Sequence, residues 1–234
     1  MLRNIPVYAA LAILSVSCGG NPGDREQTVG SDAETAAAAS ADELVEGAAE
    51  RGKALYATCI ACHGANGEGN IALDSPGIAG QSESYLVRQL WDFKLGNRGA
   101  KEGDVPGAQM RPMAMALADG VAIANVSAYV ASLPPTTPPA TVEGDAANGK
   151  KQYISKCGAC HGGDAWGNEA LFTPRLTMVG DEYLLRQVGN FRSGLRGAFA
   201  DARYGRQMAM MAKTVSDEEL KDIAAFLNEL AATR

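Results

Sequence analysis

Two copies of one five-residue motif constrain this chain more than any other feature. Cys59-Ile60-Ala61-Cys62-His63 recurs 98 residues later as Cys157-Gly158-Ala159-Cys160-His161. The 234 residues include only two histidines and five cysteines, so both histidines and four of the cysteines lie within the two motifs. This concentration indicates that one kind of site accounts for nearly all of these side chains.

Cys-x-x-Cys-His is the attachment signature of a c-type haem. Two thiols three positions apart on a helical turn can add to the two vinyl groups of one porphyrin, and the histidine that follows is then placed as a ligand of the iron. The motifs therefore predict two covalently attached haem c groups, each with two thioether bonds and one histidine ligand: Cys59, Cys62 and His63, then Cys157, Cys160 and His161.

Three other uses of paired cysteines fit the pattern less well. A zinc ribbon places its second pair about 15–20 residues after the first, whereas Cys62 and Cys157 are 95 residues apart. A thioredoxin-like pair needs a βαβ context, which the sequence does not suggest. Two structural disulfides would suit an oxidising compartment, but they leave the histidine after each pair unexplained.

The motifs belong to a longer internal repeat, because the same offset aligns many other residues without a gap. The pairs include Pro76 with Pro174, Tyr85-Leu86 with Tyr183-Leu184, Arg88-Gln89 with Arg186-Gln187, Phe93 with Phe191, Arg98 with Arg196, and Met110 with Met208. The run at 134–139 contains four prolines, which exclude a helix there. We therefore expect two tandem domains, at 42–133 and 146–234, joined by a Pro-rich linker at 134–145.

Each copy is expected to be a small, mainly α fold around one haem, with three main helices and no strand. The first helix runs into the haem motif, at 44–59 and 146–157, and the second begins near Ser82 or Gly180. The last begins at Asp119 in the first copy and, in the second, at a capping box whose first residue is Ser216. A Met-rich loop is expected before the last helix.

The Met-rich segments supply the second axial ligand of each iron in this interpretation. No spare histidine exists, and methionine sulfur is a common partner of histidine in electron carriers. The repeat pairs Met110 with Met208, and it also pairs Met113 with Met211, so the offset alone leaves both sets open. Lysine ligation or an open site are the remaining alternatives.

Both halves resemble class I cytochrome c domains, and the pair is similar to dihaem cytochromes of the c4 type. The resemblance rests on the two haem motifs, on Gly149 and Tyr153 before the second motif, and on a methionine eight residues before the start of the last helix. It covers residues 44–234. It implies that Met110 and Met208, rather than Met113 and Met211, are the axial ligands.

The resemblance also implies contacts around each haem. The carbonyls of Pro76 and Pro174 would accept a hydrogen bond from the histidine ligand, which orients its ring. The first and last helices would cross at glycine and aromatic residues: Gly52 and Tyr56 with Tyr129, and Gly149 and Tyr153 with Phe226. Tyr56 departs from the family pattern, because it lies three residues before its cysteine where Tyr153 lies four residues before its own.

The N-terminus has the pattern of an export signal. Residues 1–18 combine Arg3 with a mainly apolar run of 13 residues at 5–17. Leu14-Ser15-Val16-Ser17-Cys18-Gly19 resembles a bacterial lipoprotein box, in which Cys18 is lipidated; an ordinary signal peptide is the alternative. Residues 19–41 lack apolar periodicity and read as a flexible tether. We expect a protein on the periplasmic side of a bacterial membrane, lipid-anchored or otherwise soluble.

Charge narrows the choice of partners. The net charge of −6 argues against nucleic acid. Residues 42–133 hold 11 acidic and 7 basic side chains, whereas 143–234 hold 12 of each, so the first domain is expected to dock a more basic redox protein. Arg98 and Arg196 recur in the repeat, either as partners of haem propionates or as solvated loop cations.

Two iron centres that are each saturated by histidine and methionine leave no position for a substrate. The sequence therefore predicts an electron carrier rather than an enzyme, which passes single electrons between respiratory or other redox partners. One alternative is a haem subunit of a larger membrane-associated oxidoreductase complex. A dihaem peroxidase is less favoured, because it needs one haem with an open or displaceable position.

Overall fold

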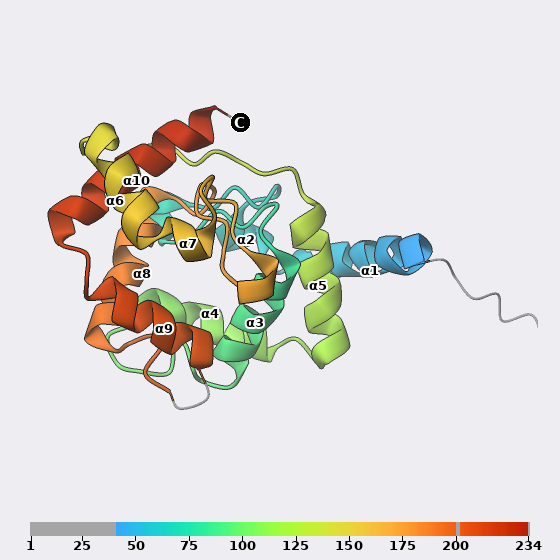
Figure 1. The fold of residues 1–234 in the computed structure, drawn as a ribbon. Coiled ribbons are helices and arrows are strands. Elements are labelled where there is room, and N and C mark those ends of the chain that lie inside the picture. Colours follow the sequence, from blue (N-terminus) through green and yellow to red (C-terminus); the bar gives the residue numbers. More distant parts are fainter. Residues whose placement is uncertain (1–40, 200–201, 234) are drawn as a thin grey trace, which may run out of the picture. The chain divides into compact units, whose positions relative to one another are not determined.

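A computed structural model describes residues 41–199 and 202–233. The expected signal peptide, Cys18 and nearly all of the tether lie outside this range. In the first half the helices are α1 (Ala41–Tyr56), α2 (Ile60–His63), α3 (Glu83–Lys94), α4 (Val105–Met115) and α5 (Gly120–Ser132), with a short 3-10 helix at Ile71–Leu73. The second half repeats them as α6 (Ala146–Lys156), α7 (Gly158–His161), α8 (Asp181–Ser193), α9 (Arg203–Ala212) and α10 (Asp217–Ala232), with a 3-10 helix at Glu169–Leu171 (Figure 1).

The described residues form a mainly α fold, as the sequence predicts. Extended pairing within them is limited to two isolated bridges, which join Asn70 to Ser75 and Asn168 to Thr173. In the same part of the chain, no single helix is long and apolar enough to cross a bilayer. Only α4 and α5 taken together, across a bend of 117°, reach that length and composition.

Local capping explains where the main helices begin. The Ser216 side chain accepts a hydrogen bond from the Glu219 amide, and the Glu219 carboxylate accepts one from the Ser216 amide, which confirms the capping box. The Asp119 side chain caps α5 through the Ala122 amide, and the Ser82 side chain caps α3. Each cap satisfies an amide at the start of a helix that would otherwise lack a partner.

The expectation of a Met-rich loop before the last helix was wrong, because both Met-rich segments are helical. In α4 the Asp104 carboxylate accepts a hydrogen bond from the Gly107 amide, and Pro106 lies in the first turn, where its missing N–H costs nothing. The corresponding helix α9 has no side-chain cap at its N-cap residue, Ala202, within the described part of the chain. Met110 and Met208 therefore extend from helices rather than from irregular chain.

The first and last helices of each half cross at a glycine. A Cβ atom on Gly149 would lie 1.8 Å from the Asp222 carbonyl oxygen of α10, and one on Gly52 would lie 2.0 Å from the Asn125 carbonyl oxygen of α5. Such a close approach of two helix backbones is possible only where a side chain is absent. These are the glycines that the resemblance places at the crossings.

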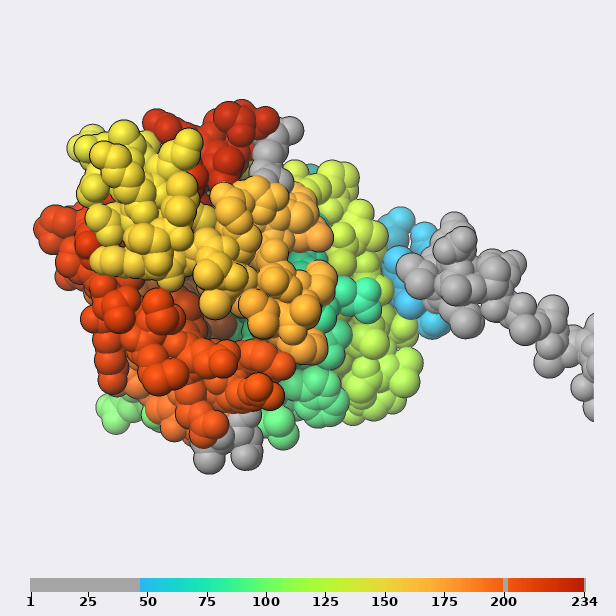
Figure 2. All heavy atoms as spheres, in the orientation of Figure 1, coloured from blue at the N-terminus to red at the C-terminus, as the bar shows by residue number. Residues whose placement is uncertain are grey.

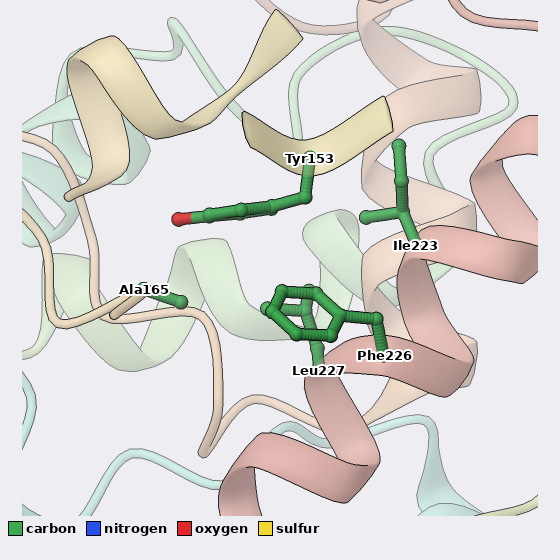
Figure 3. Packing of buried hydrophobic residues seen from close by; sticks show 5 residues of the cluster. All are labelled: Tyr153, Ala165, Ile223, Phe226 and Leu227. Atoms are coloured by element: carbon green, nitrogen blue, oxygen red, sulfur yellow. The ribbon is translucent and has the colours of Figure 1, made fainter. Parts of the chain in front are cut away.

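Aromatic rings pack beside each crossing. The rings of Tyr153 and Phe226 lie 5.6 Å apart, and those of Tyr56 and Tyr129 lie 5.3 Å apart. Figure 3 shows Tyr153 above Phe226 and Leu227, with Ile223 on the same face of α10. The expected aromatic contacts are therefore present in both halves.

The one-residue difference before the first haem motif is absorbed in a single turn. The Tyr56 carbonyl accepts a hydrogen bond from the Cys59 amide, three residues on, and the Tyr153 carbonyl accepts one from the Cys157 amide, four residues on. Both bonds are 2.8 Å long. A 3-10 turn thus replaces an α turn, and each tyrosine keeps the same place relative to its motif.

Candidate haem sites

Each half has a cavity lined by the side chains that the sequence predicts to hold a haem. The cavity of the first half has a volume of about 180 Å³, and its lining includes Cys59, Cys62, His63, Pro76 and Met110. The cavity of the second half has a volume of about 430 Å³, and its lining includes Cys157, Cys160, His161, Pro174 and Met208. Figure 2 shows a hollow in the surface between the yellow α6–α7 segment and the orange-red α9.

The cavity walls are largely apolar. Leu86, Leu90, Phe93, Val126 and Val130 line the first cavity, and Leu184, Val188, Phe191, Ile223 and Leu227 line the second. Protein interiors are normally close-packed, so apolar cavities of this size at matching places in both halves fit a large apolar group. The residues present therefore fit a haem.

The two histidines are buried and oriented by proline carbonyls. His63 Nδ1 lies 3.0 Å from the Pro76 carbonyl oxygen, and His161 Nδ1 lies 3.3 Å from that of Pro174. Because a carbonyl oxygen only accepts, Nδ1 carries the proton in each ring and Nε2 keeps the lone pair that a metal ion needs. Burial lowers the pKa of both histidines, against the opposing effect of these hydrogen bonds. Neutral imidazoles result at pH 7.

The cysteines of each motif differ in their environment. Cys59 and Cys157 are partly buried, whereas Cys62 and Cys160 are exposed, and no disulfide joins any of the four. Burial raises the pKa of Cys157 to about 11, and it also raises the pKa of Cys59. The disulfide alternative does not describe this structure.

The four candidate methionines form two pairs that differ in solvent exposure. Met110 and Met208 are half-buried, whereas Met113 and Met211 have exposed fractions of 39% and 40%. All four line a cavity. The more buried pair is better placed to keep its sulfur away from water, which is the same pair that the resemblance favours.

The structure adds a group of polar residues that the sequence left largely unassigned. Arg98 and Arg196 have exposed fractions of 7% and 8%, so the interpretation as solvated loop cations is wrong. They bond to Gln89 and Gln187 at the boundary between the halves. The repeat did mark the two glutamines as equivalent, because Arg88-Gln89 and Arg186-Gln187 align. It did not indicate that residues of the two halves would contact each other.

Comparison with known proteins agrees with this geometry. The family model for cytochrome c matches residues 49–134 and again 146–231. The chain is 33% identical over 183 residues to cytochrome c4 of Thiocapsa roseopersicina, and the aligned region covers 74% of this chain and 87% of the relative. It is 30% identical over 178 residues to the thiosulfate dehydrogenase electron acceptor of Stutzerimonas stutzeri, covering 72% of this chain and 76% of the relative.

A solved structure shows the same fold. The crystal structure of reduced recombinant cytochrome c4 from Pseudomonas stutzeri superposes with a TM-score of 0.61 at 26% sequence identity. The match covers 77% of this chain and 97% of the solved chain. The likeness therefore extends over both halves rather than over one domain.

The chain belongs to the cytochrome c family, with two cytochrome c domains in tandem. Its relatives and the solved structure make it a dihaem electron-transfer cytochrome similar to cytochrome c4, with two covalently bound haem c groups. It is an electron carrier rather than an enzyme in its own right.

Proposed function

We propose that this chain passes single electrons between two redox proteins through two haems, each held by two cysteines, one histidine and one methionine. The assigned residues are Cys59, Cys62, His63 and Met110 in the first half, and Cys157, Cys160, His161 and Met208 in the second. The observation that carries the proposal is that each set lines one apolar cavity.

The protein's own part in this function is to bind the haems, to orient their histidine ligands and to shield the iron centres from water. Haem iron supplies one-electron chemistry by alternating between Fe(III) and Fe(II). Pro76 and Pro174 hold the imidazole rings, so the ligand geometry is prepared before an electron arrives. The apolar walls exclude water, which limits the reorganisation that a change of charge at the iron would otherwise demand.

An optical spectrum of the mature protein tests this assignment. We expect a pyridine haemochrome count of two haems per chain, and a near-infrared methionine-to-Fe(III) band with the intensity of two centres. A high-spin signal from one haem, or CO binding to the reduced protein, would contradict a pure carrier and would favour the peroxidase alternative.

The partner at the first half is proposed to be basic. Residues 42–133 carry a net charge of −4, whereas 143–234 are neutral in sum. Complementary charge raises association rates, and salt screens this effect. Stopped-flow reduction by a cationic donor protein should therefore slow as ionic strength rises. A rate that ignores ionic strength would contradict charge-guided docking.

A second candidate is a role as the dedicated acceptor of one dehydrogenase. It is favoured by the relative that is described as the electron acceptor of thiosulfate dehydrogenase. Affinity purification from detergent-solubilised membranes separates the two cases. Stoichiometric recovery of a large dehydrogenase subunit supports the fixed complex, and recovery of the cytochrome alone supports a free carrier.

We also propose that the protein acts on the periplasmic side of a membrane, anchored through lipidated Cys18. The support is the apolar run that ends at this cysteine and the polar stretch that follows. Mass spectrometry of the mature N-terminus tests the anchor. A diacylglycerol-modified Cys18 is expected, and cleavage elsewhere with a soluble product would indicate an ordinary signal peptide.

A further inference from the structure

Six buried or half-buried polar side chains meet where the two halves touch, and each belongs to a pair related by the repeat. The pairs are Tyr85 with Tyr183, Gln89 with Gln187, and Arg98 with Arg196. We call this group the crossed arginine cluster. It lies outside the ligand sets described above, so its chemistry needs its own explanation.

The hydrogen bonds in the cluster cross between the halves. Arg98 donates to Gln89 of its own half at 2.8 Å and to Gln187 of the other half at 3.2 Å. Arg196 donates to Gln187 at 2.9 Å and to Gln89 at 2.6 Å. In each case the acceptor is the amide Oε1 atom, which both arginines share. The donating nitrogens of the two guanidinium groups are therefore at most two hydrogen-bond lengths apart.

Each guanidinium also contacts one tyrosine hydroxyl and one phenylalanine ring. Arg98 also donates to the Tyr183 hydroxyl at 3.2 Å, and Arg196 to the Tyr85 hydroxyl at 3.1 Å. The Arg98 guanidinium lies 4.2 Å from the Phe93 ring centroid. In the second half, Arg196 lies 4.5 Å from the Phe191 centroid. Both cations are therefore held in fixed orientations, by stacking and by in-plane hydrogen bonds.

The cluster brings two positive charges together without an ion-pair partner. Among the described residues, the three ion pairs involve neither Arg98 nor Arg196. The nearby carboxylate of Asp92 accepts from the Gln89 and Asn97 amides instead. Asp104 is likewise occupied by backbone amides and by Asn190. Buried like charges are costly unless an anion compensates them.

The cluster also faces the haem cavities. Five of its residues, Arg98 included, line both cavities, and Arg196 lines the cavity of the second half. The Arg98 Nε atom is buried and has no hydrogen-bond partner among the residues that the structure describes. A haem carries two propionate carboxylates, and a guanidinium binds a carboxylate through paired N–H groups. The cluster thus offers a fixed, unpaired donor, Arg98 Nε, on a residue that lines both cavities.

We propose that the crossed arginine cluster is a carboxylate site shared by both haems, and that Arg98 tunes the reduction potentials of both. The proposal rests on the dihaem electron-transfer function. A cation near the iron favours the reduced state, because Fe(II) carries one positive charge less than Fe(III). Since one cluster serves both cavities, a change in its charge acts on the two haems together.

Two variants of the holoprotein test the proposal through midpoint potentials in a spectroelectrochemical titration at pH 8. R98Q removes one cation, and Q187E places a carboxylate between the two guanidinium groups at nearly unchanged volume. In each variant we expect both midpoint potentials to fall, with a change of about tenfold in the reduction equilibrium of each haem, which is ~59 mV for one electron. R98K keeps the positive charge, so the reduction equilibrium of each haem should change by less than about threefold.

The control is K101Q. Lys101 donates to the Gly194 carbonyl of the other half at 2.6 Å but lines neither cavity. This variant loses one cation and one contact between the halves. The reduction equilibrium of each haem should stay within about threefold of the wild-type value. A shift of one potential only, or of neither, in R98Q and Q187E overturns the proposal. Because the haem count and the methionine bands are measured on the same samples, such a failure is distinct from failure of the electron-transfer function.

Discussion

The Tyr153 hydroxyl donates a hydrogen bond of 2.6 Å to the Gly162 carbonyl oxygen, and so ties α6 to the turn that follows the second haem motif. Tyr56 makes the same bond of 2.8 Å to Gly64 in the first half. Both tyrosine side chains are almost fully buried. Removal of either hydroxyl would leave a part-buried carbonyl without this partner.

We therefore expect Tyr153→Phe to lower the free energy of unfolding by about 1–3 kcal/mol, as is usual when a buried hydrogen-bond partner is lost. Guanidinium denaturation followed by circular dichroism measures the change. Tyr129→Phe is the matched control, because it keeps the ring and removes a hydroxyl on a half-buried residue. Equal stability of wild type and Tyr153→Phe would show that the bond contributes nothing net.

The crossing of α6 and α10 predicts a second effect. Gly149→Ala places a methyl group against the Asp222 carbonyl, so the two helices must separate. We expect destabilisation of about 1–3 kcal/mol or more, as for overpacked cores. In α8, a Cβ atom on Gly189 would meet no described atom within 4 Å apart from its chain neighbours and the backbone of its own helix, so Gly189→Ala should be neutral or stabilising by up to about 1 kcal/mol. In thermal unfolding, Gly149→Ala should lower the midpoint temperature, whereas Gly189→Ala should leave it unchanged or raise it.

Asp181 predicts a pH-dependent contribution to stability. Burial acts to raise its pKa, but hydrogen bonds from the Thr141 hydroxyl and amide, from Asn228 and from the Val142 amide outweigh this effect and lower the pKa to about 2. A carboxyl whose pKa is lower in the folded state stabilises the fold above its unfolded pKa of about 3.9. This contribution is lost as the pH falls toward 2.

Asp181→Asn should therefore cost about 1.5–3 kcal/mol at pH 7, the usual range for hydrogen bonds to a charged group. The difference from wild type should shrink between pH 4 and pH 2. Chemical denaturation across this range is the measurement, and Glu182→Gln, at an exposed neighbouring residue, is the control. A difference that stays constant with pH would show that the Asp181 carboxylate charge is not responsible.

The choice of axial methionine predicts a spectroscopic difference between neighbours. If Met208 is an axial ligand, as we propose, Met208→Leu should remove about half of the near-infrared band and allow CO to bind one reduced haem, because the iron would lose its sulfur ligand. Met211→Leu, three residues further along, should leave the full band. The same contrast is expected between Met110→Leu and Met113→Leu. Loss of the band in Met211→Leu alone would reverse the assignment.

Much of the local architecture followed from the sequence because it depends on short-range chemistry. The capping box at Ser216 and the cap at Asp119 are formed by residues within one helical turn, so they were readable in advance. The haem motifs were equally readable, because the thiols and the histidine act as neighbours along the chain. The helical state of the Met-rich segments was missed, since the N-cap residue of α9 is Ala202, which has no capping side chain, and α4 includes Pro112 within the helix.

The sequence by itself determined the duplicated cytochrome c domain, its haem motifs and the two pairs of candidate methionines. Only the tertiary structure decided that Met110 and Met208 are the more buried pair, and that Arg98 and Arg196 are buried together. Gln89 and Arg196 are 107 residues apart in the chain and yet share a hydrogen bond of 2.6 Å. An offset shows that two residues are equivalent, but contact between the halves depends on how their surfaces pack, and no local pattern encodes that packing.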